Sequence, residues 1–191
     1  STFAIIGILD VVHPENGESV IAEEPYTINW TTKGTGINYV ILEYSTDSGG
    51  NWSYVVPSGN HTVANNYGSN TYIWTSVPGD VLSNFCKLRI TDVNNFNATN
   101  MSEGFFYLRG NLSVTSPVNN DVWYVATSEN ITWTRKGNIA TVDISYSPNN
   151  GTNWTLLATG VDASSLKWQW NISETENTTT QGKIKVADSS N

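Results

Sequence analysis

The sequence predicts an all-β protein of two tandem β-sandwich domains, the second of which lacks its last strand. Two observations support this prediction. Short runs rich in Val, Ile, Tyr and Trp are separated by Gly, Asn, Ser and Thr at intervals of roughly eight to twelve residues, which is typical of sandwiches. The two halves of the chain repeat one pattern, and only the first half continues into a final apolar segment.

The repeat is clearest where segments of the two halves are aligned. HPENGESVIAEEPYTINWTTKG lies over SPVNNDVWYVATSENITWTRKG, which pairs Trp30 with Trp133 at an offset of 103 residues (133 − 30). Further along, VILEYSTDSGGNWS lies over VDISYSPNNGTNWT, and CKLRITDVNN lies over GKIKVADSSN at an offset of 96 (182 − 86). Such self-similarity indicates two copies of one structural unit. We therefore expect one domain at 7–109 and a second, incomplete domain at 110–191.

The aligned segments alternate apolar and polar residues with period two, as strands do when one face lies in a core. The predicted inward positions are Ile28, Trp30, Val40, Leu42, Tyr44, Leu88 and Ile90 in the first copy, and Ile131, Trp133, Val142, Ile144, Tyr146, Ile184 and Val186 in the second. Trp74 and Trp170 recur on the same phase and are also predicted to be core. The sequences DSGG and PNNG between such runs predict hairpin turns.

The first six residues are apolar and match the last strand of the first domain. TFAIIGILDVVHP lies over FFYLRGNLSVTSP without a gap, and the matched pairs are Phe3 with Phe106, Ile5 with Leu108 and Gly7 with Gly110. The second copy runs to Asn191 without a counterpart of that strand. A sandwich that lacks a strand leaves an apolar groove and unpaired backbone groups, which proteins normally cover. We therefore predict that residues 1–6 complete the second domain of another molecule.

This hypothesis assigns two sets of residues to an interaction in trans. The donor strand consists of Thr2, Phe3, Ala4, Ile5 and Ile6. The acceptor groove is expected between the last and first strands of the second domain, and its residues are Leu112, Val114, Trp133, Ile184 and Val186. Burial of Phe3 and Ile5 contributes about 1.5–3 kcal/mol each. Strand addition repeated head to tail produces a filament of identical subunits.

Other interpretations of these six residues remain open. The chain is also compatible with a piece cut from a longer array of surface repeats, or with a segment that folds back on its own first domain. Because the chain begins with Ser and has no secretory signal, Ser1 is expected to be a processed terminus or a boundary within a longer chain. A monomeric adhesion or carbohydrate-binding module is the alternative function.

The number of Asn-X-Ser/Thr triplets indicates an exported protein. Random placement of 24 Asn and 43 Ser plus Thr among 191 residues would give roughly five Asn-X-Ser/Thr triplets. The sequence has eleven, at Asn29, Asn51, Asn60, Asn97, Asn100, Asn111, Asn130, Asn150, Asn153, Asn171 and Asn177. N-glycans occupy surface positions of exported proteins. We expect an extracellular protein at the cell surface with covalent N-linked glycans and no other cofactor.

Composition and motifs argue against several classes of function. The net charge of −8 disfavours nucleic-acid binding, and no apolar run is long enough to insert into a membrane. The lone Cys86 excludes an intrachain disulfide and is expected to pack in the core. His13 and His61 have no catalytic or metal-binding partners at a motif spacing, and 47–51 is expected to form a turn rather than a calcium loop. We therefore expect no enzyme and no metal site.

Two of the tryptophans are compatible with the alternative function, a carbohydrate-binding module. Exposed aromatic rings on a sandwich can stack on sugars, and Trp123 and Trp168 have no Trp counterpart in the first copy, so they are candidate surface contacts. Trp52 and Trp154 each lie inside a glycosylation triplet, which makes a second sugar ligand at either ring difficult to accommodate.

The first half resembles the Ig-like domain found in secreted proteins of bacterial and archaeal cell envelopes and at the N-terminus of a fungal cell-wall glucan-assembly family. The resemblance depends on Tyr26-Thr-Ile-Asn-Trp30, Ser45-Thr-Asp-Ser-Gly-Gly-Asn-Trp52, Tyr72-Ile-Trp74 and Cys86-Lys-Leu-Arg-Ile-Thr-Asp92, and it is weaker in the second half. It implies an immunoglobulin-like fold and a surface location, without catalytic residues. Archaeal surface threads are similar in combining Ig-like beads, donor strands and dense N-glycans, which implies an archaeal source, with neighbouring filaments and surface glycans as further contacts.

Overall fold

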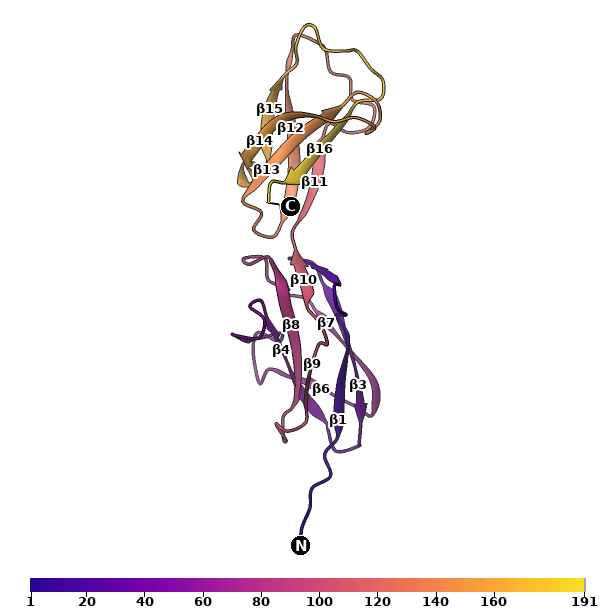
Figure 1. The fold of residues 1–191 in the computed structure, drawn as a ribbon, viewed down its shortest axis with the longest axis vertical. Helices are drawn as coiled ribbons and strands as arrows, with labels where there is room; N and C mark the ends of the chain where they lie inside the picture. The colour runs from indigo at the N-terminus through magenta and orange to yellow at the C-terminus, as the bar shows by residue number, and fades with distance from the viewer. Residues whose placement is uncertain (191) are drawn as a thin grey trace. The chain divides into compact units, whose positions relative to one another are not determined.

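The computed structural model describes residues 1–190, and the chain forms two compact units, residues 1–109 and 110–191. Asn191, where the second predicted domain ends, lies outside the described residues. Strands account for nearly all the regular structure, and the exception is a short 3-10 turn at Ala163–Ser165. The predicted fold class, tandem immunoglobulin-like sandwiches, is confirmed (Figure 1).

The first unit is a sandwich of two sheets. One sheet has the order β1-β3-β7, from Ile8–His13, Tyr26–Lys33 and Gly68–Trp74. The other follows β2-β10-β8-β4-β5, from Ser19–Ile21, Phe106–Arg109, Ser83–Asp92, Tyr39–Ser45 and Ser53–Tyr54. Two short strands extend it, β6 (Thr62–Ala64) beside β4 and β9 (Thr99–Met101) beside β8. The chain therefore crosses from one sheet to the other between β1 and β2, as in many immunoglobulin-like domains.

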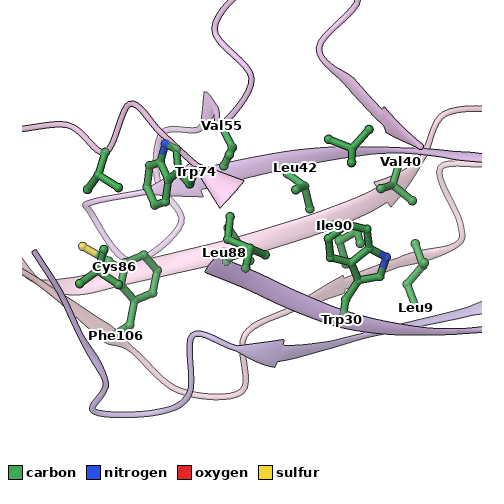
Figure 2. Close-up of a cluster of buried hydrophobic side chains, with 14 of the residues drawn as sticks. Leu9, Trp30, Val40, Leu42, Val55, Trp74, Cys86, Leu88, Ile90 and Phe106 are labelled. Atoms are coloured by element: carbon green, nitrogen blue, oxygen red, sulfur yellow. The ribbon is translucent and has the colours of Figure 1, made fainter. Parts of the chain in front are cut away.

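The core of the first unit lies between these sheets (Figure 2). Trp30 of β3 and Trp74 of β7 face Leu42 of β4 and Leu88 of β8, and all four side chains are buried. Alternation along each strand places these side chains inward, because successive residues point to opposite faces. The lone Cys86 is buried here, as predicted, and burial raises the pKa of its thiol.

The second unit repeats most of this plan. One sheet has the order β11-β12-β15, from Asn111–Ser116, Ser128–Lys136 and Lys167–Asn171. The facing sheet has the order β14-β13-β16, from Thr155–Asp162, Thr141–Ser147 and Lys183–Asp188. Its core includes the predicted Trp133 and Trp170, both buried. Trp170 contacts Tyr146 at 4.8 Å between ring centroids, and Trp74 contacts Tyr44 at the same distance in the first unit.

The two predicted hairpin turns are confirmed and share one hydrogen-bond pattern. In the first unit, the Ser45 hydroxyl accepts from the Gly49 amide at 2.8 Å and donates to Asp47 Oδ1 at 2.7 Å. In the second, Ser147 makes the same bonds to Gly151 and Asn149, at 2.8 and 3.0 Å. The Asp47 carboxylate is therefore used by the turn itself.

Candidate interaction site: an unpaired segment and an open sandwich edge

The predicted donor segment forms no strand and pairs with no element of the described chain. Residues 1–6 are all exposed, with 86% of Phe3 and 89% of Ile5 accessible to solvent. The fold-back alternative predicted that these residues would pack on the first unit, and the structure does not show this packing. Two large apolar side chains are thus exposed on a segment without secondary structure.

Gly7 and Gly110 occupy matching environments, which supports the alignment of the two junctions. A Cβ atom on Gly7 would lie 2.7 Å from Ile37 Cδ1 and 2.9 Å from the Lys33 carbonyl oxygen. A Cβ on Gly110 would lie 2.6 Å from Ile139 Cγ1 and 2.9 Å from the corresponding carbonyl of Lys136. Each glycine therefore allows the chain to pass closely over a buried isoleucine just before the first strand of its unit.

The strand that precedes Gly110 shows how such a segment is held. β10 lies between two strands of one sheet, with β2 parallel on one side and β8 antiparallel on the other. Phe106 and Leu108 point into the core and are each 1% exposed, whereas Tyr107 and Arg109 are half-buried. The alternation means that two large apolar side chains, two residues apart, fill the sandwich.

Backbone hydrogen bonds hold β10 against β2 along its length. The Tyr107 amide donates to the Glu18 carbonyl at 2.7 Å, and the Ala22 amide donates to the Arg109 carbonyl at 2.8 Å. One more bond runs from the Gly17 amide to the Phe105 carbonyl at 2.7 Å. Without β10, the Gly17 and Ala22 amides, the Glu18 carbonyl and the backbone groups that face β10 on β8 would lack their sheet partners.

The second unit contains no strand in the position of β10 within residues 110–190, and both flanking segments are irregular there. Residues 122–124, which align with β2, form no strand. β16 has six residues whereas β8 has ten, and the missing four are 179–182, which align with the part of β8 that pairs with β10. β16 pairs with β13 alone among the described strands. The two segments that correspond to the neighbours of β10 therefore both lack strand pairing in the second unit.

The 179–182 segment nevertheless runs as its counterpart does. In the first unit, the Ser48 amide donates to the Phe85 carbonyl at 2.9 Å, and in the second the Asn150 amide donates to the Gln181 carbonyl at 2.9 Å. The Ser83 and Thr179 hydroxyls both donate to carbonyls of the preceding hairpin, at 2.7 Å in each case. The backbone is thus already placed as it is in the completed unit.

Core positions next to the absent strand are more exposed in the second unit. Val20 and Ala22 in and after β2 are completely buried, whereas the aligned Trp123 is half-buried and Val125 is 40% exposed. The same contrast holds on the other side of the gap. Leu88 and Ile90 are completely buried, whereas the aligned Ile184 and Val186 are only half-buried.

The acceptor groove differs from the one expected from sequence. The sequence predicts the groove between β16, with Ile184 and Val186, and β11, with Leu112 and Val114, and includes Trp133 in it. The structure places β11 and β16 in direct contact, with Cα atoms within 8 Å, and inserting a strand would require about twice the usual 4.8 Å spacing. In the first unit β10 lies between β2 and β8, so the corresponding position in the second unit lies between 121–125 and 179–182.

The predicted acceptor groove did not include the residues that correspond to the neighbours of β10, which are Val122, Trp123, Tyr124, Val125 and 179–182. Val122 and Tyr124 are exposed, and the Trp123 ring lies 6.3 Å from Trp170 in an edge-to-face arrangement. The signal was present in the alignment, since these residues match β2. Period-two alternation identifies the face of a strand but not its neighbours in the sheet, so it could not place the gap.

None of the eleven glycosylation triplets places its asparagine in a core. Nine of these asparagines are exposed, and Asn29 and Asn100 are half-buried. The Asn100 Oδ1 accepts a hydrogen bond from the Val11 amide at 3.0 Å, and Asn51 Nδ2 donates to Asp47 Oδ2 at 2.6 Å. Nine of the eleven asparagines are therefore open to solvent.

Two tryptophans within triplets lie under cationic side chains. The Arg89 guanidinium lies 4.1 Å from the Trp52 ring centroid, and Lys185 Nζ lies 4.8 Å from that of Trp154. Arg89 also pairs with Glu43 at 2.8 Å. Trp168, the other candidate surface contact, is half-buried. These rings are partly covered by the protein's own side chains.

The two histidines take part in local structure. His13 Nδ1 lies 3.0 Å from Glu18 Oε2, at the turn between β1 and β2. Burial raises the pKa of Glu18, but hydrogen bonds from the Glu15 amide, His13 and the Tyr26 hydroxyl outweigh burial and hold that pKa below its usual value. His61 Nδ1 lies 2.7 Å from the Val56 carbonyl. Within residues 1–190, no three His, Cys, Asp or Glu side chains gather as a metal site.

Comparisons with known proteins add little to this description. No family model matches the chain, and no curated protein matches it. Among solved structures, the chain is similar to the fibronectin(III)-like modules of CbhA from Clostridium thermocellum, at 16% identity and a TM-score of 0.30. The match covers 86% of this chain and 78% of that chain. Residues 1–190 include no helix of the length and apolarity needed to cross a membrane. The fold assignment therefore depends on strand order and pairing.

Proposed function

We propose that this protein is the structural subunit of an extracellular, N-glycosylated filament that assembles head to tail by donor-strand complementation. Residues 2–6 of one copy insert into the second unit of the next, between 121–125 and 179–182. The contact is heterologous and does not close on itself, so repetition yields a fibre. The proposal assigns the chain a mechanical role, with no catalysis and no cofactor.

One observation supports the proposal above all others. The two segments that hold β10 in the first unit are the two that lack strand pairing in the second. The chain also contains a second copy of the β10 sequence pattern, at residues 3–7, and that copy is unpaired. Residues 1–190 thus contain one strand position without a strand and one unpaired segment with the matching sequence pattern.

The first unit supplies the register that we expect in the filament. Because Tyr107 aligns with Ser19 and Leu108 with Val20, the donor should place Ala4 beside Val122 and Ile5 beside Trp123. On the other edge, the antiparallel pair of Phe106 and Cys86 predicts Phe3 opposite Gly182. Phe3 and Ile5 then point into the core, and Ala4 and Ile6 point outward.

The energetics favour a long-lived contact. Burial of Phe3 and Ile5, now almost fully exposed, contributes about 1.5–3 kcal/mol each. Burial of Val125, Ile184 and Val186 in the acceptor adds to this. Insertion also gives the backbone groups of both groove walls their sheet partners, at about 0.5–1.5 kcal/mol for each hydrogen bond. Because these gains exist only in the assembled state, assembly stabilises the fold of the second unit.

Glycosylation belongs to the same proposal. The eleven triplets lie on surface or half-buried positions, where N-glycans would solvate a protein with few charged residues. Glycans require export, so the proposed location is the cell surface. An intact mass equal to that of the bare polypeptide, measured on protein from its natural source, would contradict this part of the proposal.

The experiment compares the full chain with a chain that begins at Gly7. The full chain should form filaments in negative-stain micrographs and elute in the void volume, and the shortened chain should elute as a monomer. Phe3→Ala and Ile5→Ala together should act like the deletion, whereas Thr2→Ala, a matched change on the same segment, should not. A full chain that remains monomeric at high concentration would overturn the proposal and favour a monomeric module or a piece of a longer array.

A further inference from the structure

Gly182 occupies a position that requires no glycine within its own unit. Its φ is not among the positive values found at other glycines of the described chain. A Cβ atom there would lie 3.6 Å from Tyr146 Cε2 and 3.7 Å from Thr179 Cγ2, which are ordinary van der Waals contacts. Neither backbone conformation nor local crowding therefore explains the glycine.

The first unit shows what this position faces in a completed sandwich. Cys86 aligns with Gly182, is fully buried, and lies directly opposite Phe106 of β10 (Figure 2). Side chains of directly opposite residues in an antiparallel pair lie side by side on one face, with Cβ atoms about 4.5–5.5 Å apart. The residue at position 182 would therefore lie beside the aromatic ring of an inserted strand.

Compared with the first unit, the second has a larger side chain on one side of the proposed strand position and a smaller one on the other. The wall that carries Val20 in the first unit carries the much larger Trp123 in the second, and the opposite wall changes from Cys86 to Gly182. The Trp123 ring packs edge-to-face against the buried Trp170. A core packed to normal density needs a smaller residue nearby when a Val becomes a Trp.

We infer that Gly182 is a specificity-determining residue of the acceptor groove, which leaves space for the aromatic ring of Phe3 from another copy. The inference rests on the proposed function. It defines the ligand class as an extended strand with an aromatic residue opposite Gly182 and an aliphatic residue two positions later, beside Trp123. Strands with that pattern fit, and a side chain at position 182 competes with the ring for the same space.

The test uses a chain that begins at Gly7 and a synthetic peptide, STFAIIG, titrated against it by calorimetry. Gly182→Leu should weaken binding of this peptide by roughly 10- to 100-fold, about 1.4–2.8 kcal/mol, because overfilling a packed site is destabilising. A second peptide, STAAIIG, should bind Gly182→Leu more tightly than STFAIIG does, which reverses the order found for the unsubstituted groove. Lys183→Leu, an exposed neighbour, is the matched control and should preserve that order.

The outcomes separate this inference from the proposal on which it rests. If Gly182→Leu binds STFAIIG as tightly as the unsubstituted chain does, Gly182 is not a determinant, and the filament proposal stands. If the unsubstituted chain binds neither peptide and the full chain forms no filaments, the filament proposal fails. Should Gly182→Leu not fold, Gly182→Ala provides the same comparison, with a smaller preference for STFAIIG over STAAIIG expected and an unchanged preference counting against the inference.

Discussion

At the residue scale, the first unit depends on a buried polar side chain whose partners are all present. Asn65 lies in the core and its Oδ1 accepts hydrogen bonds from Trp30 Nε1 at 2.7 Å and from the Thr32 hydroxyl at 2.8 Å. Its Nδ2 donates to the Ile37 carbonyl at 2.7 Å. Among residues 1–190, no buried side-chain nitrogen or oxygen lacks a partner. A satisfied network of this kind fixes the orientation of the core tryptophan.

Asn65→Ala should destabilise the first unit by roughly 2–4 kcal/mol, because it leaves the Trp30 and Thr32 donors and the Ile37 carbonyl buried without partners. Urea unfolding of the chain that begins at Gly7 measures the change. Asn66→Ala, at the exposed next residue, is the control and should change the free energy of unfolding by less than about 0.5 kcal/mol. Equal effects of the two substitutions would show that the network does not matter.

A second residue-scale prediction concerns acid. The Asn51 amide, the Ser45 hydroxyl and the Asn51 side chain donate to the Asp47 carboxylate and lower its pKa to about 2, from 3.8. Because the folded pKa is below the unfolded one, the contribution of Asp47 to stability is present above pH 3.8 and lost as the pH falls toward 2. NMR titration should give a carboxyl midpoint near 2. A midpoint near 3.8 would show that the turn does not bind the carboxylate.

At the scale of elements, the chain enters each unit through a glycine that passes over a buried isoleucine. Gly110 separates β10 of the first unit from β11 of the second, and Gly7 separates the donor segment from β1. Both glycines are constrained by a backbone carbonyl as well as by the isoleucine side chain. The carbonyl belongs to a strand end and cannot move without disturbing the sheet.

Gly110→Ala should therefore destabilise the second unit by about 1–3 kcal/mol, because its Cβ would overlap Ile139 and the Lys136 carbonyl. Gly36→Ala is the matched control, since no atom lies within 4 Å of a Cβ there and its φ is not positive. Differential scanning calorimetry of the chain that begins at Gly7 measures both. A Gly110→Ala chain as stable as Gly36→Ala would mean that the two junctions are loose rather than closely packed.

Most of the elements could be predicted from sequence, since alternating apolar positions such as Ile28 and Trp30 identify strands and their inward face. The hairpins followed from DSGG and PNNG, and the core tryptophans from their recurrence in both copies. The location of the groove could not be predicted, because it depends on which strands are neighbours. That is decided by the crossing of the chain between β1 and β2, which places β10 beside β2. The role proposed for Gly182 likewise depends on β10 being a neighbour of β8, which the alternation of residues does not reveal.

At the scale of the whole molecule, the two units differ in one respect that determines the proposed behaviour. The first contains its own last strand and a fully buried core, whereas in the second the residues beside the corresponding position are partly exposed. In the proposed filament, the second unit would gain core contacts at these positions on assembly, which would couple its folding to polymerisation.

Disulfide trapping of the expected register tests the central claim most directly. Ala4 and Val122 should lie side by side in a parallel pair, as Tyr107 and Ser19 do in the first unit. Under mild oxidation, a mixture of full-length Ala4→Cys and Val122→Cys chains should give a covalent dimer, and a chain with both substitutions should give a ladder of multimers. Ala4→Cys with Lys185→Cys, about four residues from the position that the register places opposite Ala4, should cross-link poorly. Only monomers after oxidation, or a bond closed within one chain, would contradict insertion of the leading segment into a neighbouring molecule.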